Sequence, residues 1–138
     1  MAVTARYLAD ESALARFRIP AVANRLKPMI QEGDIATCAI VDLEVLYSSR
    51  NLVDYEEILE ERMSLDTAPI THEVMGAAIA IQHELARQGH HRVPIAELII
   101  SAAARRADLV VLHYDLDLER IADAGGADHE WVVPRGTI

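Results

Sequence analysis

The sequence has little of what stabilises small secreted domains or anchors membrane proteins. It contains one cysteine, Cys38, so no disulfide can form within the chain. Because Cys38 lies in an apolar stretch, we interpret it as a buried thiol rather than as a nucleophile. The longest apolar runs fall far short of the ~18 residues that a membrane-spanning helix needs, and no leader pattern begins the chain. We therefore expect a soluble, cytoplasmic protein without a membrane partner.

Positive charge is also scarce. The chain has 13 lysine and arginine residues against 22 aspartate and glutamate residues, which gives a formal net charge of -9. Such a charge argues against non-specific binding of nucleic acid over the whole surface. It leaves open a local site at which a cation or a basic partner offsets clustered acids.

The clearest strand pattern is the aliphatic run LVVL at 109–112. It has no polar alternation, which is typical of a parallel strand covered on both faces. The run gives way to His113 and Tyr114, which we interpret as packing or supporting residues, and then to Asp115 and Asp117. In open α/β sheets, ligands bind beyond the carboxyl ends of such strands.

Strand and helix patterns alternate along the rest of the chain. Strands are expected at 6–9, 35–38, near Leu65, at 109–112 and at 131–133. Helices are expected to begin near residues 13, 20, 39, 54, 71, 94 and 118. The last strand should lie at a sheet edge, because a proline and a glycine follow it. This alternation predicts an α/β fold with a single domain over 1–138, a three-layer α/β/α sandwich around a parallel sheet of four to five strands.

Five acidic residues are expected to meet at one edge of this sheet. Right-handed crossovers place Asp10, Asp115 and Asp117 beyond the carboxyl ends of strands, and Glu44 and Glu97 lie on helices that can lean over that edge. Four of them also have a simpler explanation: Asp10 and Asp117 as helix caps, Glu44 as a solvated side chain, and Glu97 as a charge that favours a helix start. Together, like charges in one cleft call for a divalent cation, and carboxylate oxygens favour Mg²⁺ or Mn²⁺.

Four blocks of the sequence resemble, in order and spacing, those of PIN-domain ribonucleases, and specifically the VapC toxins of bacterial toxin-antitoxin pairs. The blocks are RYLADESALAR, DIATCAIVDLEVLYSSRN, HHRVPIAELIISAAA and DLVVLHYDLDLERIA. The resemblance extends from about residue 6 to residue 134. It implies a Mg²⁺-dependent endoribonuclease that cleaves single-stranded or looped RNA, including tRNA, and so inhibits translation. It further implies a VapB-like antitoxin as partner and a homodimer.

The resemblance also implies which residues form the site. The five acids of the family fall on Asp10, Glu44, Glu97, Asp115 and Asp117, as metal-binding and catalytic residues. The family usually has aspartate where this chain has Glu97, so the longer side chain must reach the metal by another rotamer or through a water. The family also usually has threonine or serine where this chain has a glutamate at position 11, which we expect either to turn outward or to add one more carboxylate to the site.

Metal-dependent cleavage of a phosphodiester needs no protein nucleophile, because a bound water can attack. Asp10, Glu44 and Asp115 are the expected direct or water-mediated ligands, and Ser12 is expected to support them. Arg50 and Arg92 are candidates for contacting RNA near the cleft.

Two other functions fit parts of the pattern. A phosphoacceptor receiver domain also places acids at strand ends, but it needs a lysine near the last strand, and the chain's single lysine is Lys27. A PIN scaffold without catalysis, acting through its partners, is the stronger alternative because of Glu97. For the partner, the segment 41–52, with Leu46, Tyr47 and Leu52, and the acidic helix 54–63 either form a groove for an antitoxin helix or bury their apolar residues in the core.

Overall fold

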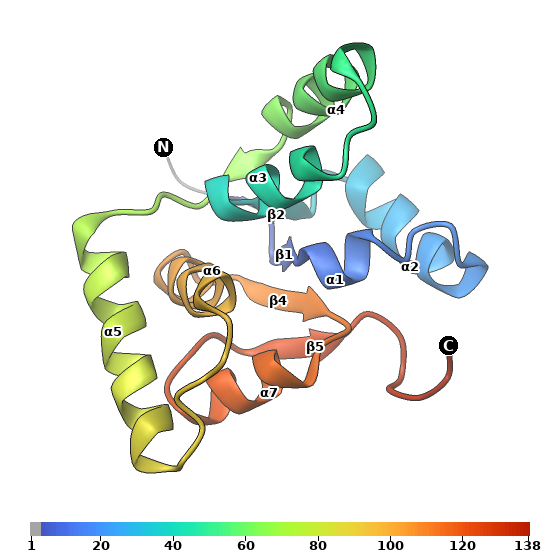
Figure 1. Ribbon diagram of the computed structural model, residues 1–138. Helices are drawn as coiled ribbons and strands as arrows, with labels where there is room; N and C mark the ends of the chain where they lie inside the picture. The colour runs from blue at the N-terminus through green and yellow to red at the C-terminus, as the bar shows by residue number, and fades with distance from the viewer. Residues whose placement is uncertain (1–3) are drawn as a thin grey trace.

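A five-stranded parallel sheet forms the centre of the protein (Figure 1), in a computed structural model that describes residues 4–138. The strands are β1 (Tyr7–Ala9), β2 (Ile35–Thr37), β3 (Asp66–Thr67), β4 (Val110–His113) and β5 (His129–Trp131). Their order across the sheet is β3-β2-β1-β4-β5, and every neighbouring pair is parallel. The predicted parallel sheet is thus confirmed, with β1 at its centre.

Seven helices connect these strands within the described residues. They are α1 (Glu11–Leu14), α2 (Pro20–Gln31), α3 (Ala39–Tyr47), α4 (Leu52–Met63), α5 (His72–Arg87), α6 (Ile95–Arg106) and α7 (Leu116–Asp123). No helix among residues 4–138 is long and apolar enough to cross a membrane.

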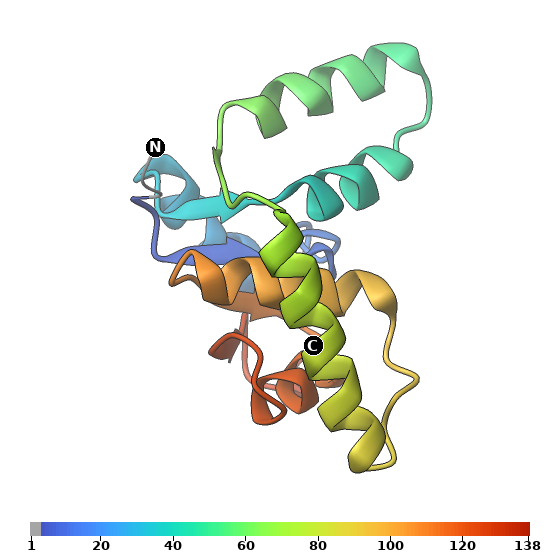
Figure 2. The same ribbon diagram turned by 90° about the vertical axis from the view of Figure 1, so that its left-hand side faces the viewer.

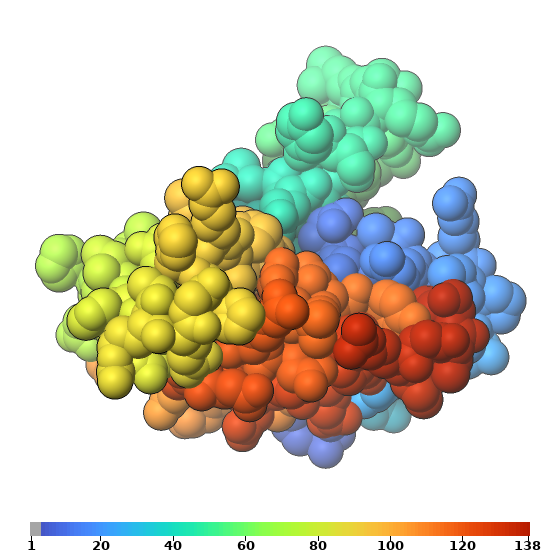
Figure 3. All heavy atoms as spheres, turned by 60° about the horizontal axis from the view of Figure 1, so that its bottom comes forward, coloured from blue at the N-terminus to red at the C-terminus, as the bar shows by residue number. Residues whose placement is uncertain are grey.

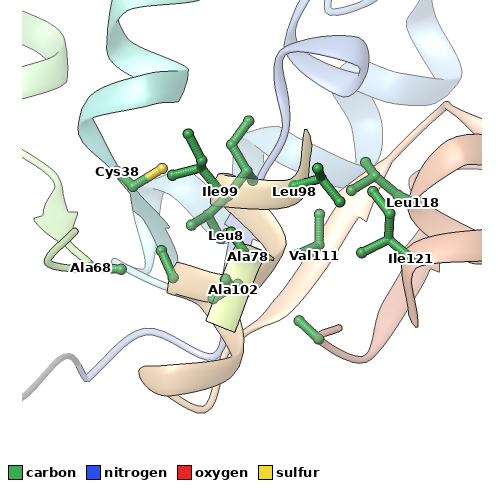
Figure 4. Close-up of a cluster of buried hydrophobic side chains, with 14 of the residues drawn as sticks. Leu8, Cys38, Ala68, Ala78, Leu98, Ile99, Ala102, Val111, Leu118 and Ile121 are labelled. Atoms are coloured by element: carbon green, nitrogen blue, oxygen red, sulfur yellow. The ribbon is translucent and has the colours of Figure 1, made fainter. Parts of the chain in front are cut away.

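The side chains of the strands alternate between two hydrophobic cores, as the two-residue period of a strand requires. Leu8 and Val111, which are paired in register, face a core shared with α5, α6 and α7 (Figure 4). Ala9 and Leu112, the next pair, face a second core that contains Val22 of α2. The sheet therefore lies between two helical layers, which confirms the three-layer architecture.

Helix α4 stands away from the sheet beside α3 (Figure 2), and a buried ion pair fixes its end. The Nε atom of Arg62 lies 2.9 Å from Oδ1 of Asp42 on α3. Thr37, at the end of β2, donates to the same carboxylate oxygen at 2.8 Å and accepts from Arg62 at 2.6 Å. All three residues are buried, and both charges of the pair have hydrogen-bond partners there.

Several element boundaries differ from the prediction by one or two residues, among them those of β5 and α6. The last strand comprises His129–Trp131 rather than 131–133, because His129 pairs with Val111 and the aliphatic residues Val132 and Val133 follow the strand into the core. Helix α6 begins at Ile95, with the preceding proline as its N-cap residue. Cys38 is buried and its burial raises the pKa of the thiol, as expected of a packing residue.

Candidate metal centre

Two acidic residues lie just beyond the carboxyl ends of neighbouring strands. Asp10 follows β1 and Asp115 follows β4, which lies beside β1. The backbone N–H of Asp10 donates to the carbonyl of Leu112 at 2.8 Å, so pairing continues to the point where both strands end. Each aspartate also begins a helix, because its side chain accepts a hydrogen bond from a backbone N–H two residues later. The interpretation of Asp10 as a helix cap is therefore correct. It does not prevent Asp10 from also belonging to the group of acids at this edge of the sheet.

Three carboxylates converge at this edge of the sheet. Asp10, Glu44 of α3 and Glu97 in the first turn of α6 each offer one oxygen, and these oxygens lie within 4.8 Å of one another. Asp10 is 1% exposed and Glu97 is 8% exposed, whereas Glu44 is half-buried. The simpler explanation of Glu97, a charge that favours a helix start, fits its position in the first turn of α6, but it does not explain the burial of Glu97 beside Asp10 and Glu44.

Two buried carboxylate oxygens of these residues have no hydrogen-bond donor among the described residues. Oδ2 of Asp10 accepts from the backbone N–H of Ser12 at 3.0 Å and from its hydroxyl at 2.5 Å. Oδ1 of Asp10 and Oε1 of Glu44 are buried without a partner. A buried carboxylate oxygen without a donor is costly, and a divalent cation held by oxygen ligands would satisfy it. The donor set thus fits a divalent metal site.

Electrostatic repulsion within the cluster is strong. Burial, with the negative charges of Asp10, Asp115, Glu44 and Asp117, raises the pKa of Glu97 from 4.5 to about 8. Burial is also the main reason why the pKa values of Asp10 and Glu44 are raised. Without a cation, the protein therefore retains a proton on Glu97 near neutral pH.

Asp115 and Asp117 lie at the border of this cluster and are not among the three residues that converge most closely. Oδ1 of Asp115 accepts from the backbone N–H of Asp117 at 3.0 Å, which starts α7. Their charges still act on Glu97. Glu11, expected to turn outward, is instead half-buried, and its charge raises the pKa of Glu44.

Ser12 joins the two strand ends that position the acids. Its hydroxyl donates to Asp10 and accepts from the backbone N–H of Tyr114 at 2.9 Å. The expectation that Ser12 supports Asp10 is confirmed by these contacts. Arg16 adds a second link, because it donates to the Ser12 carbonyl at 2.6 Å and lies over the Tyr114 ring, 4.8 Å from its centroid.

His113 supports the other side of the cluster from within the core. Its Nδ1 accepts from the backbone N–H of Asp115 at 3.1 Å, and its Nε2 lies 2.8 Å from Nδ1 of His129. Burial and His129 lower the pKa of His113 to about 4, so the ring is neutral and its Nδ1 lone pair stays available. The ring packs against Trp131, with 4.8 Å between centroids, and Trp131 meets Tyr114 edge-on at 5.3 Å.

The buried pair of Asp42 and Arg62 was not predicted. Asp42 and Glu44 lie two residues apart on α3, yet they point to different surroundings: Asp42 binds Arg62 and Glu44 joins the cluster. One signal was present in the sequence, namely an acid within an apolar helix, but its arginine partner lies 20 residues away.

Of the two arginines expected to contact RNA, Arg50 pairs with Asp54 at 3.4 Å, whereas Arg92 lines a hollow next to Asp117.

Comparison with known proteins places this arrangement in a family. The PIN domain family model matches residues 7–124, most of the chain. The chain belongs to the PIN domain family. This confirms the resemblance of the four sequence blocks.

Among curated PIN relatives, Ribonuclease VapC21 of Mycobacterium tuberculosis is 41% identical over 98% of this chain and 99% of its own. Ribonuclease VapC51 of the same organism is 37% identical over 96% of this chain and 97% of its own. Among solved structures, VapBC2 from Rickettsia felis bound to a promoter DNA fragment gives a TM-score of 0.71 at 17% identity, covering 90% of this chain and 96% of that chain. The structural likeness shows the PIN fold.

Proposed function

We propose that this PIN domain protein is a Mg²⁺- or Mn²⁺-dependent endoribonuclease, the VapC-like toxin of a toxin-antitoxin pair. The observation that supports this most is the convergence of Asp10, Glu44 and Glu97, with buried oxygens that lack donors. Its near full-length relatives are named ribonucleases, which agrees with the chemistry of the cluster. We further propose that the protein acts in the cytoplasm on single-stranded or looped RNA, tRNA included, and so inhibits translation.

The residues of the site have different roles in the proposed reaction. Asp10, Glu44 and Glu97 would hold the ion. Asp115, which the sequence predicted as a ligand, and Asp117 would add negative charge beside it. A divalent ion held there supplies a water that is nucleophilic near neutral pH and offsets charge on the leaving oxygen. Ser12 keeps Asp10 in place, which leaves Oδ1 free to face the ion.

Two measurements test this function. Purified protein should cleave RNA with Mg²⁺ or Mn²⁺ and stop when the metal is chelated, and Asp10→Asn should abolish cleavage. Calorimetry should show a stability gain of about 2.7 kcal/mol at a hundredfold excess of metal over its dissociation constant. That gain should be absent in Asp10→Asn and retained in Glu60→Gln, which removes an exposed charge on α4. Metal binding without any cleavage would favour the alternative, a PIN scaffold that acts only through partners.

We also propose a basic antitoxin segment as the inhibitor. Tyr47 is 92% exposed and Leu52 is 70% exposed, so part of segment 41–52 offers an apolar surface beside acidic α4. Leu46 is buried and belongs to the core instead. Solved structures with this fold include VapBC assemblies, in which a second chain is present. A basic side chain of the antitoxin would enter among the acids and compete with the cation.

The antitoxin's basic residues and the oligomeric state can be tested separately. Charge reversal of those residues should weaken both binding and inhibition, and full inhibition after reversal would contradict the mechanism. A homodimer is proposed for the toxin alone, and light scattering should give twice the mass of the 15.2 kDa chain.

A further inference from the structure

A small hollow lies directly beside the acidic cluster, between the α5–α6 turn and the start of α7. It has a volume of about 230 Å³ and is lined by Gly89, His90, His91, Arg92, Val93, Asp117 and Arg120. Figure 3 shows the yellow turn that follows α5 beside the orange segment that contains α7. Asp117 lines the hollow, and its charge also acts on Glu97 in the acidic cluster, so the hollow and the cluster are adjacent.

Four of the seven residues that line this hollow are histidine or arginine, in a protein whose net charge is -9. Of the 13 lysine and arginine side chains, seven form ion pairs within the described residues. Arg92 forms neither an ion pair nor a side-chain hydrogen bond there, and neither do His90 and His91, although all three are exposed. Arg120 lies 3.8 Å from Asp117, and this long ion pair leaves other N–H groups of its guanidinium free to bind a ligand.

Donors of this kind suit a phosphate group. An arginine guanidinium can bind two phosphate oxygens at once, and a histidine ring N–H can donate to a third. An acidic protein that acts on a polyanion needs such cations close to its site, because its overall field repels the substrate. The hollow supplies them on the side of the cluster where α7 begins.

We infer that this hollow binds the backbone phosphate of a single-stranded RNA nucleotide neighbouring the phosphodiester at the acidic cluster. The inference rests on the proposed ribonuclease function and adds the path of the strand, from the cluster past Asp117 to Arg92 and His91. Contacts of this type position the strand and do not select a base. The hollow therefore affects how tightly RNA binds and leaves the chemical step to the carboxylates.

The test compares Arg92→Gln and the double variant His91→Gln/Arg92→Gln with a matched control, Arg106→Gln. Arg106 is an exposed arginine in the last turn of α6, at the opposite end of that helix from Glu97, so its replacement removes the same charge far from the hollow. For a short single-stranded RNA in Mg²⁺, Arg92→Gln should raise KM roughly tenfold, the loss expected for one charged hydrogen bond, with kcat unchanged. Arg106→Gln should match the parent protein.

Binding is measured separately from cleavage in EDTA, where metal-dependent cleavage of the same RNA strand stops. Fluorescence anisotropy over a salt series should show that Arg92→Gln lowers the slope of log affinity against log salt by about 0.7, the value of one phosphate contact on a single strand. If the parent cleaves RNA but Arg92→Gln and the double variant keep its KM and salt slope, the hollow is no phosphate site and the ribonuclease function stands. An equal loss in Arg106→Gln would also overturn the inference, because it would reflect net charge alone. If the parent cleaves no RNA but Arg92→Gln lowers the slope, the proposed ribonuclease function fails and the phosphate site stands.

Discussion

Replacing Glu97 by glutamine should stabilise the metal-free protein at pH 8 and have little effect at pH 5. The pKa of Glu97 is about 8 in the folded protein and near 4.5 when the chain is unfolded. Between these values the folded state binds more protons than the unfolded state, so stability falls as the pH rises from 4.5 to 8. Because glutamine resembles the protonated side chain of Glu97 at every pH, the variant does not lose stability over this pH range.

The size of the effect follows from the pKa difference. At about 1.4 kcal/mol per pKa unit, the shift from 4.5 to about 8 sets an upper limit of ~5 kcal/mol. Asp115 and Asp117 are partly exposed, and water next to them screens part of the repulsion. We expect about 2 kcal/mol at pH 8, which corresponds to a rise in melting temperature of roughly 8 °C for a domain of this size.

Calorimetry in EDTA at pH 5 and pH 8 measures this effect. Glu60→Gln is the control, because it removes one exposed charge on α4 and should change the melting temperature little at either pH. An equal difference between Glu97→Gln and the parent at both pH values would refute the electrostatic reasoning. So would a variant less stable than the parent at pH 8. The stabilised variant should at the same time lose RNA cleavage, a conflict between stability and function that is common at active sites.

Three further predictions concern the same site and its supports. Glu97→Asp should retain or raise cleavage in a steady-state assay, because the charge stays while the side chain shortens to the family's usual length. Ser12→Ala should cost about 1–3 kcal/mol in denaturant unfolding and reduce cleavage, since the buried carboxylate of Asp10 loses its hydroxyl donor. Arg62→Met should cost about 3–5 kcal/mol, because it leaves the charge of Asp42 buried and unpaired, whereas Arg62→Met with Asp42→Leu should recover most of that loss in the same assay.

Most of the fold could be predicted from the sequence because the central strands are short aliphatic runs. The run at 109–112 is buried on both faces, and such a run has little alternative to a central parallel strand. Strand β5 could not be located in this way. Its residues are half-buried and polar or amphipathic, and its position depends on pairing with Val111 rather than on its own composition.

The acidic site was predictable as a set but not in its geometry. Asp10 and Asp115 follow recognisable strands, so the sheet alone brings them to one edge. On α3, the sequence offers two acids, Asp42 and Glu44, and the family resemblance assigns the site to Glu44, which the structure brings to Asp10. Residues two apart on a helix differ by about 200° in direction, so only one of the two can face the cluster. Asp42 binds Arg62 instead, and the distance between these two residues along the chain hides their pairing from sequence analysis.

The aromatic packing behind the cluster gives the protein its own optical probe. Trp131 is the one tryptophan of the chain, and its indole lies against His113, whose ring holds the backbone of Asp115. Its Nε1–H also donates to Glu119 on α7, the helix that Asp115 begins. A movement of Asp115 on loading of the site would thus alter the surroundings of a single fluorophore. Intrinsic emission can therefore follow the state of this site in unlabelled protein, with no second tryptophan to obscure the signal.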